Sequence, residues 1–200
     1  MKPILGSLTQ FFLVFILAVL FPVAALAADI YTLDPSHSYV LWHINHFGFS
    51  NPSGKWMVAE GTLMLDEKNP QASKINVTIH TAEIVTGNKE LDEHLKGALF
   101  FDVTKYPLAT FVSNKVNVTE KNQAKVTGIL TVHGISKPVT LDVVLNKIGI
   151  NPITNKQTVG FTASTHLNRS DFGITTLLPG LGDEVKINIE AEAYKATQTL

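Results

Sequence analysis

The chain has 200 residues, with 16 Lys and Arg against 17 Asp and Glu and a formal net charge of −1 at pH 7. This balance, without a long run of one sign, gives no reason to expect nucleic acid or an anionic membrane surface as a partner. Cysteine is absent, which excludes disulfides and thiol chemistry.

The first 27 residues have the three parts of a cleavable secretory signal peptide. Lys2 gives a basic start, residues 11–21 (FFLVFILAVLF) an apolar stretch, and Ala25-Leu26-Ala27 a small-residue cleavage site. An uncleaved membrane anchor is the alternative, but Pro22 and the Ala-rich end fit cleavage better. We therefore expect an exported protein with a signal peptide at 1–27 and one domain at 28–200.

Most of the remaining chain alternates apolar and polar residues with the period of two that half-buried β-strands show. The clearest case is 125–145, a hairpin in which Leu130 and Leu141 share an apolar face and 134–138 forms the turn. About eight substantial strands linked by turns predict an antiparallel all-β barrel or sandwich. In chain order, the expected strands are 30–34, 38–46, 55–65, 74–81, 109–118, 125–133, 139–146, 157–167 and 185–192.

Two segments depart from this pattern. Within 55–65 the alternation slips, and Gly61 stands where a bulge or bend would restore the register. Residues 88–99 change to a helical period, with Leu91, Leu95 and Leu99 on one side and Asn88 as N-cap. We expect a short helix whose leucines pack on the barrel or cap it.

Alternation alone does not say whether the apolar face points into the barrel or outward, as in outer-membrane barrels. Charges such as Lys186, Glu190 and Glu192 would crowd the narrow lumen of an inverted barrel, and aromatic girdles are missing. The apolar face is therefore predicted to point inward. The residues leave open whether the interior is filled or hollow, although Gly128 and Ala163 among the inward positions leave room.

Two groups of polar residues have types suited to metal binding or catalysis. His43 and His46 are three apart on an expected strand, so they point to opposite faces and cannot share one ion. Asp34, Ser36 and His37 are the residue types of a hydrolase triad, but they are crowded into a turn and no G-x-S-x-G is present. We interpret them as a hydrogen-bonded turn.

Arg169 is the only arginine of the chain and precedes Ser170-Asp171. Its guanidinium could anchor a phosphate, such as that of a lipid head group, bidentately at the mouth of a pocket. A structural pair with Asp171 or another carboxylate is the alternative.

Several motifs together resemble the YceI-like family, also called polyisoprenoid-binding proteins. Leu91, Leu99 and Ala82 differ from residues common in that family (Arg, Asp and Ser), so a polar contact made by the helical insertion of other members is in doubt here. The matching motifs are YTLDPSHS at 31–38, HFG at 46–48, DEHL at 92–95, FFDV at 100–103, KYP at 105–107, FVS at 111–113, GILTVHGISKPV at 128–139, NRSDFGI at 168–174 and GDEV at 182–185.

The resemblance implies an eight-stranded antiparallel lipocalin-like β-barrel with a short helical insertion, in the Gram-negative periplasm. It implies a tunnel for a polyprenyl chain or another amphipathic lipid, such as an isoprenoid quinone, in a carrier that needs no cofactor or metal. An enzyme or stress-response protein acting on a lipophilic molecule is the alternative, and a homodimer is left open. The predicted ligand-facing residues are Val40, Trp42, Ile44, Ile75, Val77, Ile79, Phe111, Leu130, Leu141, Val143, Phe161, Arg169, Phe172 and Ile187.

Overall fold

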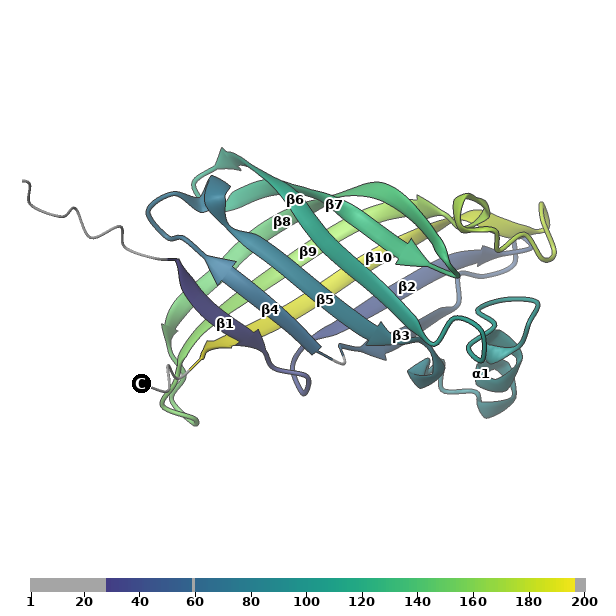
Figure 1. Ribbon diagram of the computed structural model, residues 1–200. Coiled ribbons are helices and arrows are strands. Elements are labelled where there is room, and N and C mark those ends of the chain that lie inside the picture. Colours follow the sequence, from purple (N-terminus) through teal and green to yellow (C-terminus); the bar gives the residue numbers. More distant parts are fainter. Residues whose placement is uncertain (1–27, 59, 197–200) are drawn as a thin grey trace, which may run out of the picture.

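The computed structural model describes residues 28–58 and 60–196, so the expected signal peptide lies outside the described residues. Strands dominate the described part of the chain (Figure 1). They are β1 (Asp29–Leu33), β2 (Tyr39–His46), β3 (Ser53–Met57), β4 (Glu60–Leu65), β5 (Lys74–His80), β6 (Leu108–Glu120), β7 (Gln123–Val132), β8 (Ile135–Ile150), β9 (Gln157–Asn168) and β10 (Leu181–Lys195). The helical elements are α1 (Lys89–Lys96) and the short 3-10 turns η1 (Pro70–Ala72), η2 (Thr81–Glu83) and η3 (Arg169–Phe172).

The strands form one antiparallel sheet in the order β1-β4-β5-β6-β7-β8-β9-β10-β2-β3, and β1 also pairs with β10. Along β10, β2 pairs with residues 181–190 and β1 with residues 193–195, so β1 and β2 act as one interrupted strand. In the same way, β3 pairs with β2 and β4 with β1. Eight continuous positions therefore close the barrel, and the predicted eight-stranded antiparallel fold is confirmed.

The hairpin between β7 and β8 is tighter than the sequence analysis predicts. Val132 pairs with Ile135, and only His133 and Gly134 lie between them, with φ of 51° and 74°. This is the geometry of a two-residue hairpin turn, so the predicted turn over 134–138 is wrong. Pro138 lies within β8 before β9 joins it at Asp142, so its missing N–H faces a side without a partner strand.

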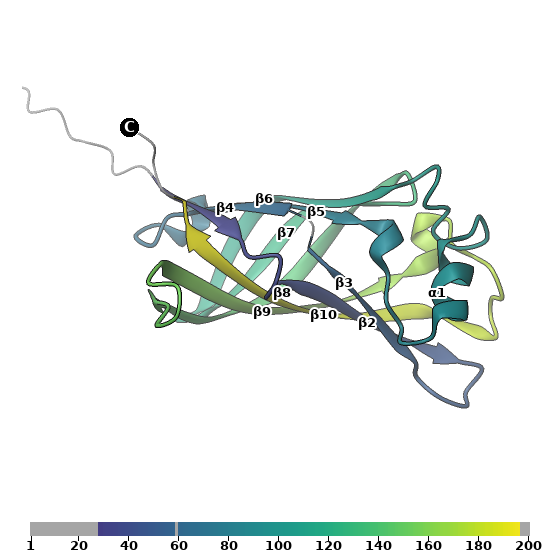
Figure 2. The same ribbon diagram turned by 90° about the horizontal axis from the view of Figure 1, so that it is seen from below.

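Helix α1 lies across one end of the barrel (Figure 2). It begins as predicted, because the Asn88 side chain accepts hydrogen bonds from the N–H groups of Glu90 (3.0 Å) and Leu91 (3.3 Å). It ends at Lys96, and Leu99 lies beyond it with 62% of its surface exposed. The prediction that Leu99 extends the packed leucine stripe is therefore wrong, because Gly97 leaves the helical conformation.

Two glycines leave space that large neighbouring side chains occupy. The predicted bulge at Gly61 is replaced by a break between β3 and β4, and Gly61 instead accommodates the side chain of Leu33, which lies where a Cβ would be. Gly128 is covered by the ring of Phe111, 2.6 Å from the position of a Cβ. Gly128 therefore does not open the interior, contrary to the sequence-based expectation that it leaves room.

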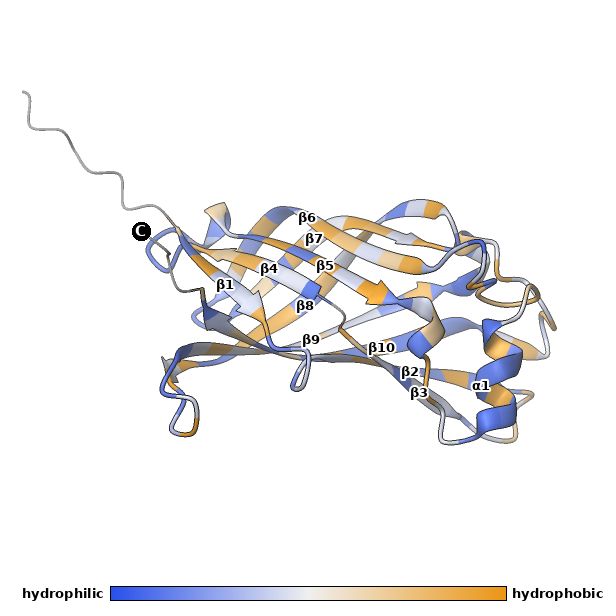
Figure 3. Ribbon diagram, turned by 60° about the horizontal axis from the view of Figure 1, so that its bottom comes forward, coloured by the Kyte–Doolittle hydropathy of each residue, from blue (hydrophilic) through white to orange (hydrophobic). Residues whose placement is uncertain are grey.

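The buried apolar side chains form two separate clusters inside the barrel. Hydropathy alternates along the strands (Figure 3), because one face of each strand is apolar and points inward. Among the described residues, no helix is long and apolar enough to cross a membrane. One cluster contains Tyr31, Leu33, Val58, Leu63, Leu65, Val159 and Ala193. The other includes Leu95 of α1 and contains Trp42, Ile84, Leu95, Phe100, Ile174 and Leu181.

Candidate functional site

A cavity of about 960 Å³ lies inside the barrel. Its wall is almost entirely apolar, so the hollow alternative, and not the filled one, describes this interior. All of the predicted ligand-facing residues line it: Val40, Trp42, Ile44, Ile75, Val77, Ile79, Phe111, Leu130, Leu141, Val143, Phe161, Arg169, Phe172 and Ile187. Their contact with a ligand stays a prediction.

The period of two along β8 shows how the sequence builds this wall. Leu141 and Val143 line the cavity, while Asp142 between them points outward and forms an ion pair with Lys125 of β7 at 2.5 Å. The two residues that break the alternation of the hairpin, Ile129 and Val144, are partly exposed on the outer face. The inward direction of the apolar face is thus as predicted.

The cavity reaches the surface at the end that carries α1. His46, Ser50, His94 and Leu177 are exposed and also line the cavity. They come from the β2–β3 hairpin, α1 and the loop between β9 and β10. We call this opening the helix-end mouth. Sequence reasoning missed it, because the three segments lie far apart in the chain.

A second opening lies at the opposite end, between the β4–β5 loop and the β6–β7 turn. Glu67, Lys74, Lys121 and Asn122 are exposed there and line the cavity. We call this opening the polar mouth. In the sequence, this mouth corresponds to two turns that contain charged residues. The strand pattern does not predict that these turns lie beside each other.

Arg169 is buried, with 7% of its surface exposed. Its side chain joins η3 to the loop that follows it and to the start of β10. Its guanidinium donates three hydrogen bonds to backbone carbonyls: Nε to Gly182 (2.7 Å), Nη1 to Ile174 (2.9 Å) and Nη2 to Leu181 (3.0 Å). Burial lowers the pKa of Arg169, and the nearby Asp183 carboxylate opposes this shift. The guanidinium thus has a structural role through carbonyls and not through the Asp171 carboxylate, and its contact with a head group stays a prediction.

The same loop is held by a second polar contact. Asp183 accepts hydrogen bonds from the Ser170 hydroxyl (2.7 Å) and the Ser170 N–H (2.9 Å). These bonds favour the carboxylate, and the Ser170 hydroxyl is the largest reason why the pKa of Asp183 lies below its usual value.

The two tryptophans near α1 differ in how their indole N–H groups are satisfied. Trp56 donates to the carbonyl of Thr81 at 3.1 Å. Trp42 lines the cavity, yet its buried Nε1 has no hydrogen-bond partner. A buried donor without an acceptor costs about 1–3 kcal/mol. The Trp42 indole packs over Gly54 of β3, with Nε1 2.9 Å from the position that a Cβ on Gly54 would occupy, so this N–H faces the wall and not the cavity.

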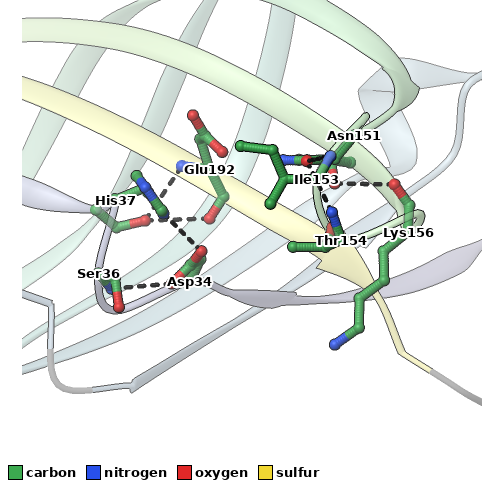
Figure 4. A network of polar contacts seen from close by, with 10 residues as sticks. Asp34, Ser36, His37, Asn151, Ile153, Thr154, Lys156 and Glu192 are labelled. Atoms are coloured by element: carbon green, nitrogen blue, oxygen red, sulfur yellow. Dashed lines mark hydrogen bonds and ion pairs between the residues drawn. The ribbon is translucent and has the colours of Figure 1, made fainter.

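Of the candidate catalytic and metal-binding groups, only His46 lines the cavity. Figure 4 shows the turn in which His37 Nδ1 is 2.8 Å from Asp34 and the Ser36 N–H donates to Asp34 at 2.9 Å, so the interpretation as a hydrogen-bonded turn is confirmed. Burial raises the pKa of Asp34, but these hydrogen bonds outweigh it and leave the pKa below its usual value. His46 lines the cavity, and within residues 28–58 and 60–196 no group of three or more His, Asp or Glu could hold a metal ion.

Comparisons with known proteins agree with this architecture. Proteins named YceI from Salmonella arizonae and Salmonella enteritidis are 40% identical over 180 residues, covering 89% of this chain and 93% of theirs. The crystal structure of Burkholderia cenocepacia BcnA superimposes with a TM-score of 0.72 at 25% identity, covering 82% of this chain and 99% of that one. The YCEI protein of Campylobacter jejuni gives a TM-score of 0.66 at 31% identity, covering 76% and 90%.

A more distant neighbour supports the barrel fold alone. It is described as a polyisoprenoid binding domain from Saccharophagus degradans, with a TM-score of 0.62 at 12% identity over 83% of this chain and 98% of that one. A family model described as the YceI-like domain matches residues 31–193. This match and the 40% identity to curated relatives show that the chain belongs to the YceI-like family.

Proposed function

We propose that the protein is an exported, periplasmic carrier that binds a polyisoprenoid or a similar amphipathic lipid inside its barrel. The observation that carries the proposal is the apolar cavity of about 960 Å³, which the inward faces of the strands form together. Family membership and the polyisoprenoid-binding description of a structural neighbour agree with a lipid ligand. The signal-peptide pattern at 1–27 supports export.

An apolar wall is sufficient to bind a prenyl chain. Each methylene transferred from water to an apolar site contributes about 0.8 kcal/mol, so a long chain gains affinity without specific chemistry. The size is also suitable, since small-molecule pockets usually have volumes of about 300–1,000 Å³.

The polar group of the ligand is proposed to lie at the helix-end mouth. His46 and His94 favour this end, because both line the cavity, are exposed at the mouth and can form a hydrogen bond with a hydroxyl or carbonyl oxygen of the lipid. The prenyl chain then extends along the barrel toward the polar mouth.

Blocking the cavity tests this proposal. Leu141→Trp places a larger side chain in the cavity, whereas Ile129→Trp adds the same bulk on the outer face of the neighbouring strand. We expect uptake of a polyprenol added in detergent to fall at least tenfold in Leu141→Trp and to stay at the wild-type level in Ile129→Trp, with both variants folded by circular dichroism. Wild-type protein that yields no lipid on solvent extraction and takes up no added polyprenol would contradict the proposal.

A further inference from the structure

We infer that the end of the barrel carrying α1 docks on a lipid bilayer through an apolar rim, and that lipid enters and leaves through the helix-end mouth inside this rim. The apolar rim consists of Phe47, Phe49, Leu99 and Leu177. The inference rests on the proposed function, because it names the surface from which the bound lipid comes.

The rim residues belong to three loops, and these loops lie at one end of the molecule (Figures 1 and 2). Phe49 is 90% exposed at the tip of the β2–β3 hairpin, and Leu99 follows α1. Hydrogen bonds join the loops: the Phe47 N–H donates to Gly180 at 3.0 Å, and the Thr176 hydroxyl donates to the carbonyl of Leu99 at 2.6 Å. The apolar rim is therefore one connected surface.

The short segments that carry the rim residues contain no charged side chains. Residues 47–54, 97–101 and 172–182 have no Asp, Glu, Lys or Arg, whereas the adjacent α1 and residues 102–107 carry charges of both signs. Dehydrating a charge is expensive, so these uncharged segments can enter the boundary between head groups and acyl chains while α1 stays among the head groups. Because the inserted segments contain no basic residues, binding would depend on apolar insertion and not on anionic lipid.

The rim surrounds an opening and does not form a groove. Leu177 belongs to the apolar rim and also lines the cavity, so apolar surface continues from the outside to the inside. Projecting apolar tips around a mouth suit a soft bilayer better than a structured protein partner. With the rim inserted, a prenyl chain can pass into the barrel without crossing water, and its polar group stays near the interface.

Phe49 and Ile153 provide a matched test. Ile153 is 92% exposed in the β8–β9 turn at the opposite end of the barrel, and neither residue lines the cavity. The experiment uses vesicles of phosphatidylethanolamine and phosphatidylglycerol that contain a fluorescent polyprenol, and it measures protein flotation and the rate of transfer to the protein. The variants are Phe49→Ser, the double change Phe49→Ser with Leu99→Ser, and Ile153→Ser.

We expect Phe49→Ser to reduce vesicle partitioning and transfer rate about tenfold, the double variant to reduce them further, and Ile153→Ser to leave both unchanged. Uptake from detergent should be normal in every variant, and raising the salt concentration should not release the wild type. Wild-type rates in the double variant, or an equal loss in Ile153→Ser, would overturn the inference. Failure of uptake from detergent would instead count against the proposed function, while flotation would still test docking.

Discussion

The two ends of the barrel differ in chemistry although the same strands connect them. At the helix end, three uncharged segments (47–54, 97–101 and 172–182) surround a mouth beside a buried cluster that includes Trp42 and Phe100, and the charged helix α1 lies next to them. At the other end, the polar mouth is bordered by Glu67, Lys74 and Lys121. Polarity along the outside of the strands does not explain this difference, because the outer face is mixed throughout.

The difference indicates that the two ends of the barrel have different roles in lipid entry. Charged side chains at a mouth stay hydrated and keep that mouth in water, whereas the uncharged rim segments can leave water at lower cost. The contrast predicts that changes at the helix end affect folding and lipid exchange, while equivalent changes at the polar mouth have small effects.

The largest expected effect on stability comes from Arg169. Arg169→Met removes three hydrogen bonds and leaves the carbonyls of Ile174, Leu181 and Gly182 without partners, so we expect the free energy of unfolding to fall by about 3 kcal/mol. Lys74→Met at the polar mouth should change it by less than about 0.5 kcal/mol. Urea denaturation of both variants measures the contrast, and equal losses would contradict it.

The same Arg169 variant tests the predicted head-group contact. If the guanidinium only fastens the loop, a prenyl phosphate and the corresponding prenyl alcohol should lose affinity equally. A selective loss for the phosphate would show that Arg169 also binds the head group.

A smaller effect is expected at Gly128, where the wall between the two ends is tightly packed. In Gly128→Ala, the new Cβ would lie 2.6 Å from the ring of Phe111 and 2.5 Å from the carbonyl oxygen of Val112, so the ring must move and the free energy of unfolding should fall by about 1–3 kcal/mol. Gly149→Ala is the control, since its Cβ would meet only the Lys147 side chain at 3.5 Å. Similar melting temperatures for both variants would contradict this expectation and would show that the Phe111 ring moves at little cost in stability.

The smallest effect is a dependence on pH at the helix end. The folded state depresses the pKa of Asp183, so the contribution of this carboxylate to stability is present above its unfolded pKa and is lost as pH falls through the folded pKa. The protection of the Ser170 amide, measured as its exchange rate relative to the intrinsic rate at each pH, should therefore fall in this acidic range, but not in Asp183→Asn, whose Ser170 amide should already be less protected at neutral pH. Identical pH profiles for the two proteins would contradict this assignment.

The sequence predicts the barrel well, because the period of two indicates which side of each strand is exposed to solvent. It also predicts the start of α1, because an Asn at the N-cap has a local effect. It does not predict that the strand resumes at Ile135, since a left-handed φ at His133 has no clear sequence signal.

The features that depend on contacts distant in sequence were not predictable in the same way. The carbonyl partners of Arg169 and the filling of Gly128 by Phe111 follow from register and loop paths. The residues predicted to face a ligand all lie in the cavity wall, because they follow the period of two. Both mouths were missed, because a mouth is formed by loops that carry no periodic pattern.

Native mass spectrometry of the purified protein is the most direct test of lipid binding in the barrel. We expect each chain to carry one lipid-sized adduct that solvent extraction removes, and we expect Leu141→Trp to lack this adduct while Ile129→Trp retains it. The same spectrum reports whether two chains associate. A wild-type spectrum with only the bare chain, before and after incubation with polyprenol, would contradict the account.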